Sequence, residues 1–154
     1  MARLIVLILA GVLVPGAAPG AAPAGSGWRE APAYAALFAP AGPRGAAYRT
    51  FVSPLGLDET LAQVARMPGR LAPPGAWQPR PLAPADAFGT VGTYDHWTLL
   101  RLYGARLPRV ARGPVGNGDG AVTEAWTLIS PYPDPSLQRL EPGTLLIVLS
   151  LGQS

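Results

Sequence analysis

The pattern of apolar and polar positions is clearest in the C-terminal half of the chain. Residues 145–149 are Leu-Leu-Ile-Val-Leu, without polar alternation, which is typical of a strand covered on both faces. Upstream, β-prone segments at 107–113 and 121–130 flank a Gly-Asn-Gly-Asp-Gly turn. Asn-Gly and Asp-Gly pairs favour the positive backbone angles of tight hairpin turns. The pattern therefore predicts a β-hairpin and, after it, a strand at the centre of the sheet.

A helix is predicted over residues 57–67 because apolar residues recur there at helical spacing. Leu57, Leu61 and Val64 fall on one side of such a helix. Asp58 is placed to act as its N-cap.

A second helix is predicted with its body at 96–103. Asp95 is placed to cap this helix, and Gly104 suits the left-handed position after its end. Trp97 is assigned to the apolar side, so it is expected in the core.

Two further segments complete the predicted domain. Residues 46–53 carry aromatic and β-branched residues and are predicted as a strand. Residues 68–93 are rich in proline and glycine, which predicts a long loop. Trp77 and Phe88 are expected to hold this loop against the core, since an unanchored loop of this length is costly to order.

These elements indicate an α+β fold. We expect a small, mainly antiparallel sheet of about four to five strands, with the two short helices on one side of it. The alternative is an all-β sandwich or partial barrel with loosely packed helices.

Residues 1–24 have the pattern of a secretory signal peptide. A basic start at Arg3 precedes the apolar run Leu4–Val14, and Ala22-Pro23-Ala24 forms a small-residue cleavage site. The apolar run is far shorter than the roughly 20 residues of a membrane-spanning helix. We therefore expect a secreted or periplasmic protein with no stable membrane span after signal cleavage. A retained N-terminal membrane anchor is the alternative.

The signal pattern divides the remaining chain into two parts. Residues 25–45 are rich in Ala, Pro and Gly and are interpreted as a flexible leader, the alternative being a short helix docked on the domain through Tyr34, Leu37 and Phe38. Residues 46–154 are predicted to form a single globular domain.

Composition narrows the function classes. The chain has no cysteine, so neither disulfides nor a lipid-modified cysteine can stabilise or tether it. All twelve basic residues are arginine, and the formal net charge is +3. This mild excess does not favour a nucleic-acid partner.

No metal site or cofactor is predicted from the residues present. Zinc sites draw on Cys and His, and this chain has one His and no Cys. Residues 117–120 resemble the middle of a calcium-binding loop, but Val115 and Trp126 occupy two of its ligand positions. The segment is therefore interpreted as a hairpin turn.

Four residues are the candidates for catalysis. Asp86, Asp95 and Asp134 lie in predicted loops or caps, where paired carboxylates could meet as they do in glycan hydrolysis. His96 is the single histidine and lies on the predicted apolar arc of its helix, which favours a structural role. Asp95 and Asp134 also have helix capping as an alternative role.

Three residues are the candidates for binding. Arg109 and Arg112 belong to the densest basic stretch, and Tyr132 lies between two prolines, which suggests an exposed ring. Arg112 is also predicted to pair with Glu124 across the hairpin.

The sequence thus predicts an exported, noncatalytic binding or structural module of the cell envelope or extracellular space. An envelope protein, a glycan or a small ligand is the expected partner. The alternative is a small envelope hydrolase that uses loop carboxylates, and a cleft in which two of the four catalytic candidates converge would favour it.

Overall fold

The computed structural model describes residues 27–38, 47–66, 77–88, 96–116 and 121–150. The strands are β1 (Arg29–Glu30), β2 (Ala47–Ser53), β3 (Arg80–Pro81), β4 (Arg109–Gly116), β5 (Val122–Ser130), β6 (Tyr132–Pro133), β7 (Leu140–Glu141) and β8 (Thr144–Ser150). The helices are α1 (Pro32–Phe38), α2 (Leu57–Ala65), α3 (Pro84–Phe88) and α4 (His96–Tyr103).

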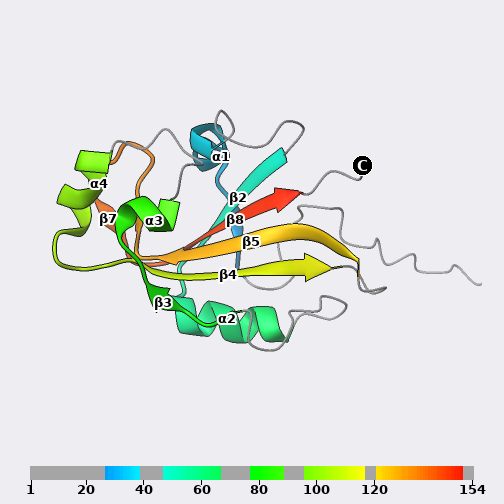
Figure 1. The fold of residues 1–154 in the computed structure, drawn as a ribbon. Helices are drawn as coiled ribbons and strands as arrows, with labels where there is room; N and C mark the ends of the chain where they lie inside the picture. The colour runs from blue at the N-terminus through cyan, green and yellow to red at the C-terminus, as the bar shows by residue number, and fades with distance from the viewer. Residues whose placement is uncertain (1–26, 39–46, 67–76, 89–95, 117–120, 151–154) are drawn as a thin grey trace, which may run out of the picture.

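Six of these strands form one open antiparallel sheet in the order β1-β2-β8-β5-β4-β3 (Figure 1). The short strands β6 and β7 pair separately. The fold is α+β, as predicted, and the sheet is not closed into a barrel. The main sheet has six strands instead of the predicted four to five, because the short strands β1 and β3 extend its two edges.

The apolar C-terminal strand lies in the middle of the sheet, as predicted. β8 pairs with β2 on one side and with β5 on the other. Leu145, Leu146, Ile147 and Val148 are all buried. Their side chains alternate between the two faces of the sheet, so each face contributes to a core.

The predicted hairpin is formed by β4 and β5, and its turn at 117–120 lies outside the described residues. Its register shows that the predicted Arg112–Glu124 pair is wrong. Arg112 is opposite Thr127, whereas Glu124 is opposite Val115. The odd separation of Arg112 and Val115 places their side chains on opposite faces of the strand, so Arg112 and Glu124 point away from each other.

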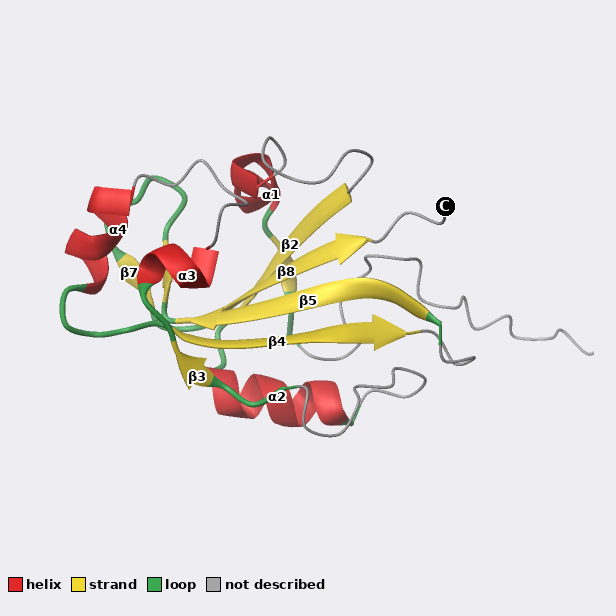
Figure 2. Ribbon diagram, viewed as in Figure 1, coloured by secondary structure: helices red, strands yellow, loops and turns green. Residues whose placement is uncertain are grey.

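Helices cover both faces of the sheet, which corrects the prediction of helices on one side only. Figure 2 shows α1, α3 and α4 on one face and α2 on the other. We call these the three-helix face and the α2 face. Each has its own buried cluster: Leu99 and Tyr103 belong to that of the three-helix face, and Phe51 and Trp126 to that of the α2 face.

Part of the predicted leader packs on the sheet. Its described residues contain β1, which pairs with β2, and α1, whose Tyr34 is buried. The Tyr34 hydroxyl donates a hydrogen bond to the carbonyl oxygen of Pro133 at 2.8 Å. Over these residues the structure therefore corresponds to the docked helix that was the alternative.

The two long helices begin and end close to the predicted residues. α2 has Gly56 as its N-cap without a side-chain capping bond, so the assignment of Asp58 as N-cap is wrong. Asp58 instead lies in the first turn. After α4, Gly104 takes the predicted left-handed conformation, with φ of 55°.

The two edge strands of the sheet, β1 and β3, are short. Among the described residues, Arg80 and Pro81 are the only ones that pair with the outer side of β4, and Leu82 N–H donates to the Pro108 carbonyl at 3.0 Å. Backbone groups of alternate residues point to the same side of a strand. Because the Pro108 carbonyl points to the outer edge, the backbone groups of Pro114 point there too. Proline has no N–H to offer there, which weakens this edge as a template for another strand.

Candidate functional site

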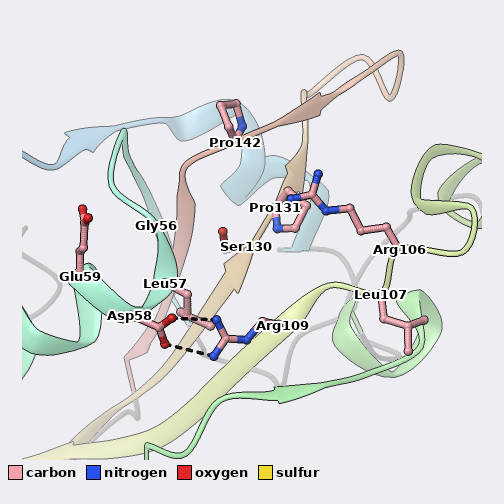
Figure 3. A pocket seen from close by; sticks show the side chains of 10 residues that line it. All are labelled: Gly56, Leu57, Asp58, Glu59, Arg106, Leu107, Arg109, Ser130, Pro131 and Pro142. Carbon is pink, nitrogen blue, oxygen red and sulfur yellow. Dashed lines mark hydrogen bonds and ion pairs between the residues drawn. The ribbon is translucent and has the colours of Figure 1, made fainter.

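A hollow of about 360 Å³ lies at the end of the sheet where α2 begins (Figure 3). The first turn of α2, the segment after α4, the start of β4 and the end of β5 meet there. Its lining residues are Gly56, Leu57, Asp58, Glu59, Arg106, Leu107, Arg109, Ser130, Pro131 and Pro142.

An ion pair across the hollow joins β4 to α2. The Arg109 guanidinium donates two hydrogen bonds to the Asp58 carboxylate, each at 3.0 Å. Hydrogen bonding and charge from Arg109 lower the pKa of Asp58. Both side chains are exposed, so this pair orients the two groups more than it stabilises the fold.

Two further charges line the hollow. Arg106 and Glu59 are exposed and lie on opposite sides of it in Figure 3. Within the described part of the chain, neither side chain forms an ion pair. With Arg109 and Asp58 they give the hollow two positive and two negative groups, so its lining has no net charge.

Ser130 ends β5, as the sequence predicted, and its hydroxyl is engaged in the fold. Ser130 Oγ donates to the Gly143 carbonyl at 2.8 Å. Gly143 packs tightly, because a Cβ there would lie 2.0 Å from the Ser53 carbonyl oxygen. This contact fixes Ser130 as part of the wall of the hollow.

Of the three binding candidates, only Arg109 lines the hollow. Arg112 lies on the three-helix face, and its Nη2 donates to the carbonyl oxygens of Asp86 and Ala87 at 2.8 and 2.7 Å. These bonds connect β4 to α3. Burial is the main cause that lowers the pKa of Arg112, followed by the charge of Arg80.

The prediction that Tyr132 presents an exposed ring is wrong. The residue is 8% exposed, and its ring contacts Tyr34 edge-to-face with centroids 5.9 Å apart. The flanking prolines do not make an exposed turn, because Tyr132 and Pro133 form β6, which pairs with β7. Burial raises the pKa of Tyr132.

Asp134 holds the segment between β6 and β7. One carboxylate oxygen accepts the backbone N–H groups of Gln138 and Arg139 at 2.7 and 2.8 Å, and the other accepts the Ser136 hydroxyl. Partial burial raises the pKa of Asp134, but these hydrogen bonds outweigh it and the net pKa is lowered. The predicted role as a helix cap is wrong, because no helix follows Asp134 in the described part of the chain; its carboxylate instead holds the turn that joins β6 to β7.

The other catalytic candidates are not brought together in the described structure. Asp86 is exposed on α3. His96 begins α4, but its side chain and Asp95 lie outside the described residues. A second hollow, of about 270 Å³, is lined by Thr98, Arg101, Leu102, Leu137 and Gln138. Neither Asp86 nor Asp134 lines either hollow.

Asp58 was predicted only as a helix cap and Arg109 only as a binding candidate, so their pairing was missed. Asp58 and Arg109 are 51 residues apart, and only the packing of α2 against the sheet makes them a pair.

Trp97, predicted for the core, is 73% exposed on α4, which corrects its assignment. Its neighbours Leu99 and Tyr103 point into the core instead.

Two features are absent from the described residues. They contain no group of three or more His, Asp or Glu residues placed to hold a metal ion. No helix among them has the length and apolar character needed to cross a membrane. Comparisons with protein-family models, curated proteins and solved structures found no match.

Proposed function

We propose that this protein is an exported, noncatalytic binding module, and that the hollow at the start of α2 is where it takes its ligand. Export rests on the signal-peptide pattern of residues 1–24. The binding role rests on one observation: Arg106 and Glu59 line the hollow without an ion-pair partner in the described residues, while Arg109 and Asp58 neutralise each other.

The balance of charge selects the class of ligand. A lining with two positive and two negative groups does not concentrate a polyanion, because the long-range fields of its charges cancel. It suits a small dipolar ligand that has an acidic group for Arg106 and an amino group for Glu59. The free end of a short peptide or an amino acid has this chemistry.

The size of the hollow agrees with such a ligand. A volume of about 360 Å³ is at the lower end for small-molecule sites. Leu57, Leu107 and Pro142 add apolar contacts between the charged groups. Because the charged groups are exposed, we expect weak binding, with a dissociation constant on the order of 1 mM.

Binding is tested by NMR titration of the ¹⁵N-labelled protein with dialanine. We expect the signals of Arg106 Nε–H and of the α2 first turn to shift. N-acetyl-dialanine lacks the ammonium group and dialanine amide lacks the carboxylate, so both should bind more weakly. Arg106→Gln should weaken dialanine binding by roughly tenfold or more, since hydrogen bonds to charged groups are the stronger class.

The matched control is Arg66→Gln, which removes the same charge from the exposed end of α2, away from the residues that line the hollow. This variant should bind dialanine as the wild type does. Shifts spread evenly over the surface, or equal losses in both variants, would contradict a site at the hollow.

A further inference from the structure

A second surface, independent of the hollow, lies on the outer side of α4. Trp97 is 73% exposed and Leu100 is 37% exposed, although both are large apolar residues. They are three residues apart and therefore share one side of the helix, and exposed Arg101 lies beside Leu100 on it. We call Trp97, Leu100 and Arg101 the α4 patch.

The patch is held firmly in place by the opposite side of the helix. Leu99 and Tyr103 are buried in the cluster of the three-helix face. The Tyr103 hydroxyl donates to the Pro131 carbonyl at 2.6 Å, which fixes the end of α4 against the sheet. The exposed tryptophan thus belongs to a rotationally fixed helix, which lowers the entropic cost of using it for binding.

Two exposed arginines give the patch and the end of its helix positive charge. Arg101 belongs to the patch, and exposed Arg106 follows the end of the helix. Arg101 Nη2 donates a long hydrogen bond of 3.4 Å to the Thr98 hydroxyl, which is a neutral group.

We propose that the α4 patch binds the surface of an anionic lipid bilayer. Tryptophan is favoured at the level of the lipid headgroups, and leucine gains from entering the boundary with the acyl chains. Arginine beside them donates charge-assisted hydrogen bonds to lipid phosphates. The patch combines these three groups on one exposed helix side.

The size of the patch favours a bilayer over a protein partner. A specific protein interface buries about 800 Å² on each partner. One aromatic side chain supplies about 150–250 Å², so Trp97 with Leu100 provides only a fraction of that area. A bilayer needs no complementary shape, and its negative surface adds attraction of about 1 kcal/mol for each nearby arginine, or roughly fivefold in binding.

The test measures quenching of tryptophan fluorescence by lipids that carry bromine in their acyl chains. The full chain is added to vesicles of brominated phosphatidylcholine, with and without phosphatidylglycerol as the anionic lipid. Residues 1–24 contain no tryptophan, so insertion of the N-terminal apolar run gives no signal of its own. We expect strong quenching in the anionic vesicles and a fall in quenching as salt is raised.

The variants assign the signal to the patch. Trp97→Phe should remove most of the quenching, whereas Trp28→Phe, at a half-buried position on the α2 face, should keep it. Arg101→Gln should weaken vesicle binding by roughly fivefold. Arg66→Gln, on the opposite face of the sheet, should leave it unchanged.

Several outcomes would overturn the proposal. These are quenching that survives Trp97→Phe, equal quenching in neutral and anionic vesicles, or no quenching in either. If quenching is absent but light scattering shows self-association that Trp97→Ser abolishes, the patch binds a second copy of the chain instead. Dialanine binding at the hollow is measured without lipid, so either proposal can fail while the other stands.

Discussion

The two faces of the sheet are covered in different ways. The α2 face has one nine-residue helix over a cluster that includes Trp126, Phe51 and Leu128. The three-helix face has three shorter helices over a cluster that includes Tyr34, Phe88 and Tyr103. Tyr34 of α1 donates to Pro133, and Tyr103 of α4 donates to Pro131.

Two kinds of substitution should therefore have different effects on stability. Each face has a buried core shared by several strands, so truncation of a core side chain affects the whole sheet. On the three-helix face α1 and α4 each add one tyrosine hydroxyl bond to the segment 131–133, and the loss of one such bond should loosen one element only. The two proposed binding regions involve helices on different faces: the hollow lies against α2, and the lipid-binding patch lies on α4.

The largest expected effect comes from Trp126→Ala on the α2 face. Trp126 is 1% exposed, contacts Trp77 edge-to-face, and donates its indole N–H to Glu124 at 2.7 Å. We expect a loss of about 3–5 kcal/mol in the free energy of unfolding. Urea denaturation followed by circular dichroism measures it.

The matched control for this prediction is Trp97→Ala, which truncates the same residue type on the surface. It should change stability by less than about 0.5 kcal/mol. Equal losses in the two variants would mean that burial of the Trp126 indole does not decide the cost.

An intermediate effect is expected for the tyrosines of the three-helix face. Tyr103→Phe and Tyr34→Phe each leave a buried carbonyl without its donor, which should cost about 1–2 kcal/mol. Hydrogen exchange should show the loss of protection mainly in α4 for the first variant and in α1 for the second. Protection lost evenly over all strands in either variant would contradict the separation of the faces.

The smallest effect is expected for Asp134→Asn, and it should depend on pH. The folded-state pKa of Asp134 is lowered, so its stabilising effect is present above the unfolded pKa of about 4 and is lost as pH falls through the folded value. At pH 7 the substitution should cost about 1 kcal/mol, because it removes the charged acceptor of the hydrogen bonds from Ser136, Gln138 and Arg139.

The check is the urea midpoint of wild type and variant at pH 7 and again near pH 2. The gap between them should narrow at the lower pH. A gap that stays constant would show that the Asp134 charge does not contribute.

The strands and long helices were predictable because each is encoded by a local pattern. The apolar run at 145–149 predicted a doubly covered strand, and the Gly-rich turn predicted the β4–β5 hairpin. The helix arrangement could have been corrected from the same reasoning. A strand that buries both faces requires cover on both sides of the sheet, which two helices on one side do not provide.

The other errors concern contacts between distant segments. α4 carries apolar residues around much of its circumference, so its periodicity did not show that Trp97 faces outward. Leu99 and Tyr103 face the core instead, and Tyr103 donates to Pro131, 28 residues away. The hollow could not be predicted from the sequence either, because the Asp58–Arg109 pair depends on how α2 lies across the sheet.

The position of β8 has a consequence for the order in which the sheet can form. β2 and β5 do not neighbour each other, and each is joined to the sheet through β8. Before residues 144–150 leave the ribosome, β1–β2 and β3–β4–β5 have no strand to connect them. Closure depends on pairing between β2 and β8 across nearly 100 residues, a slow step for a chain. Among the described strands the central one is therefore synthesised last, and the two parts of the sheet stay unconnected until it appears.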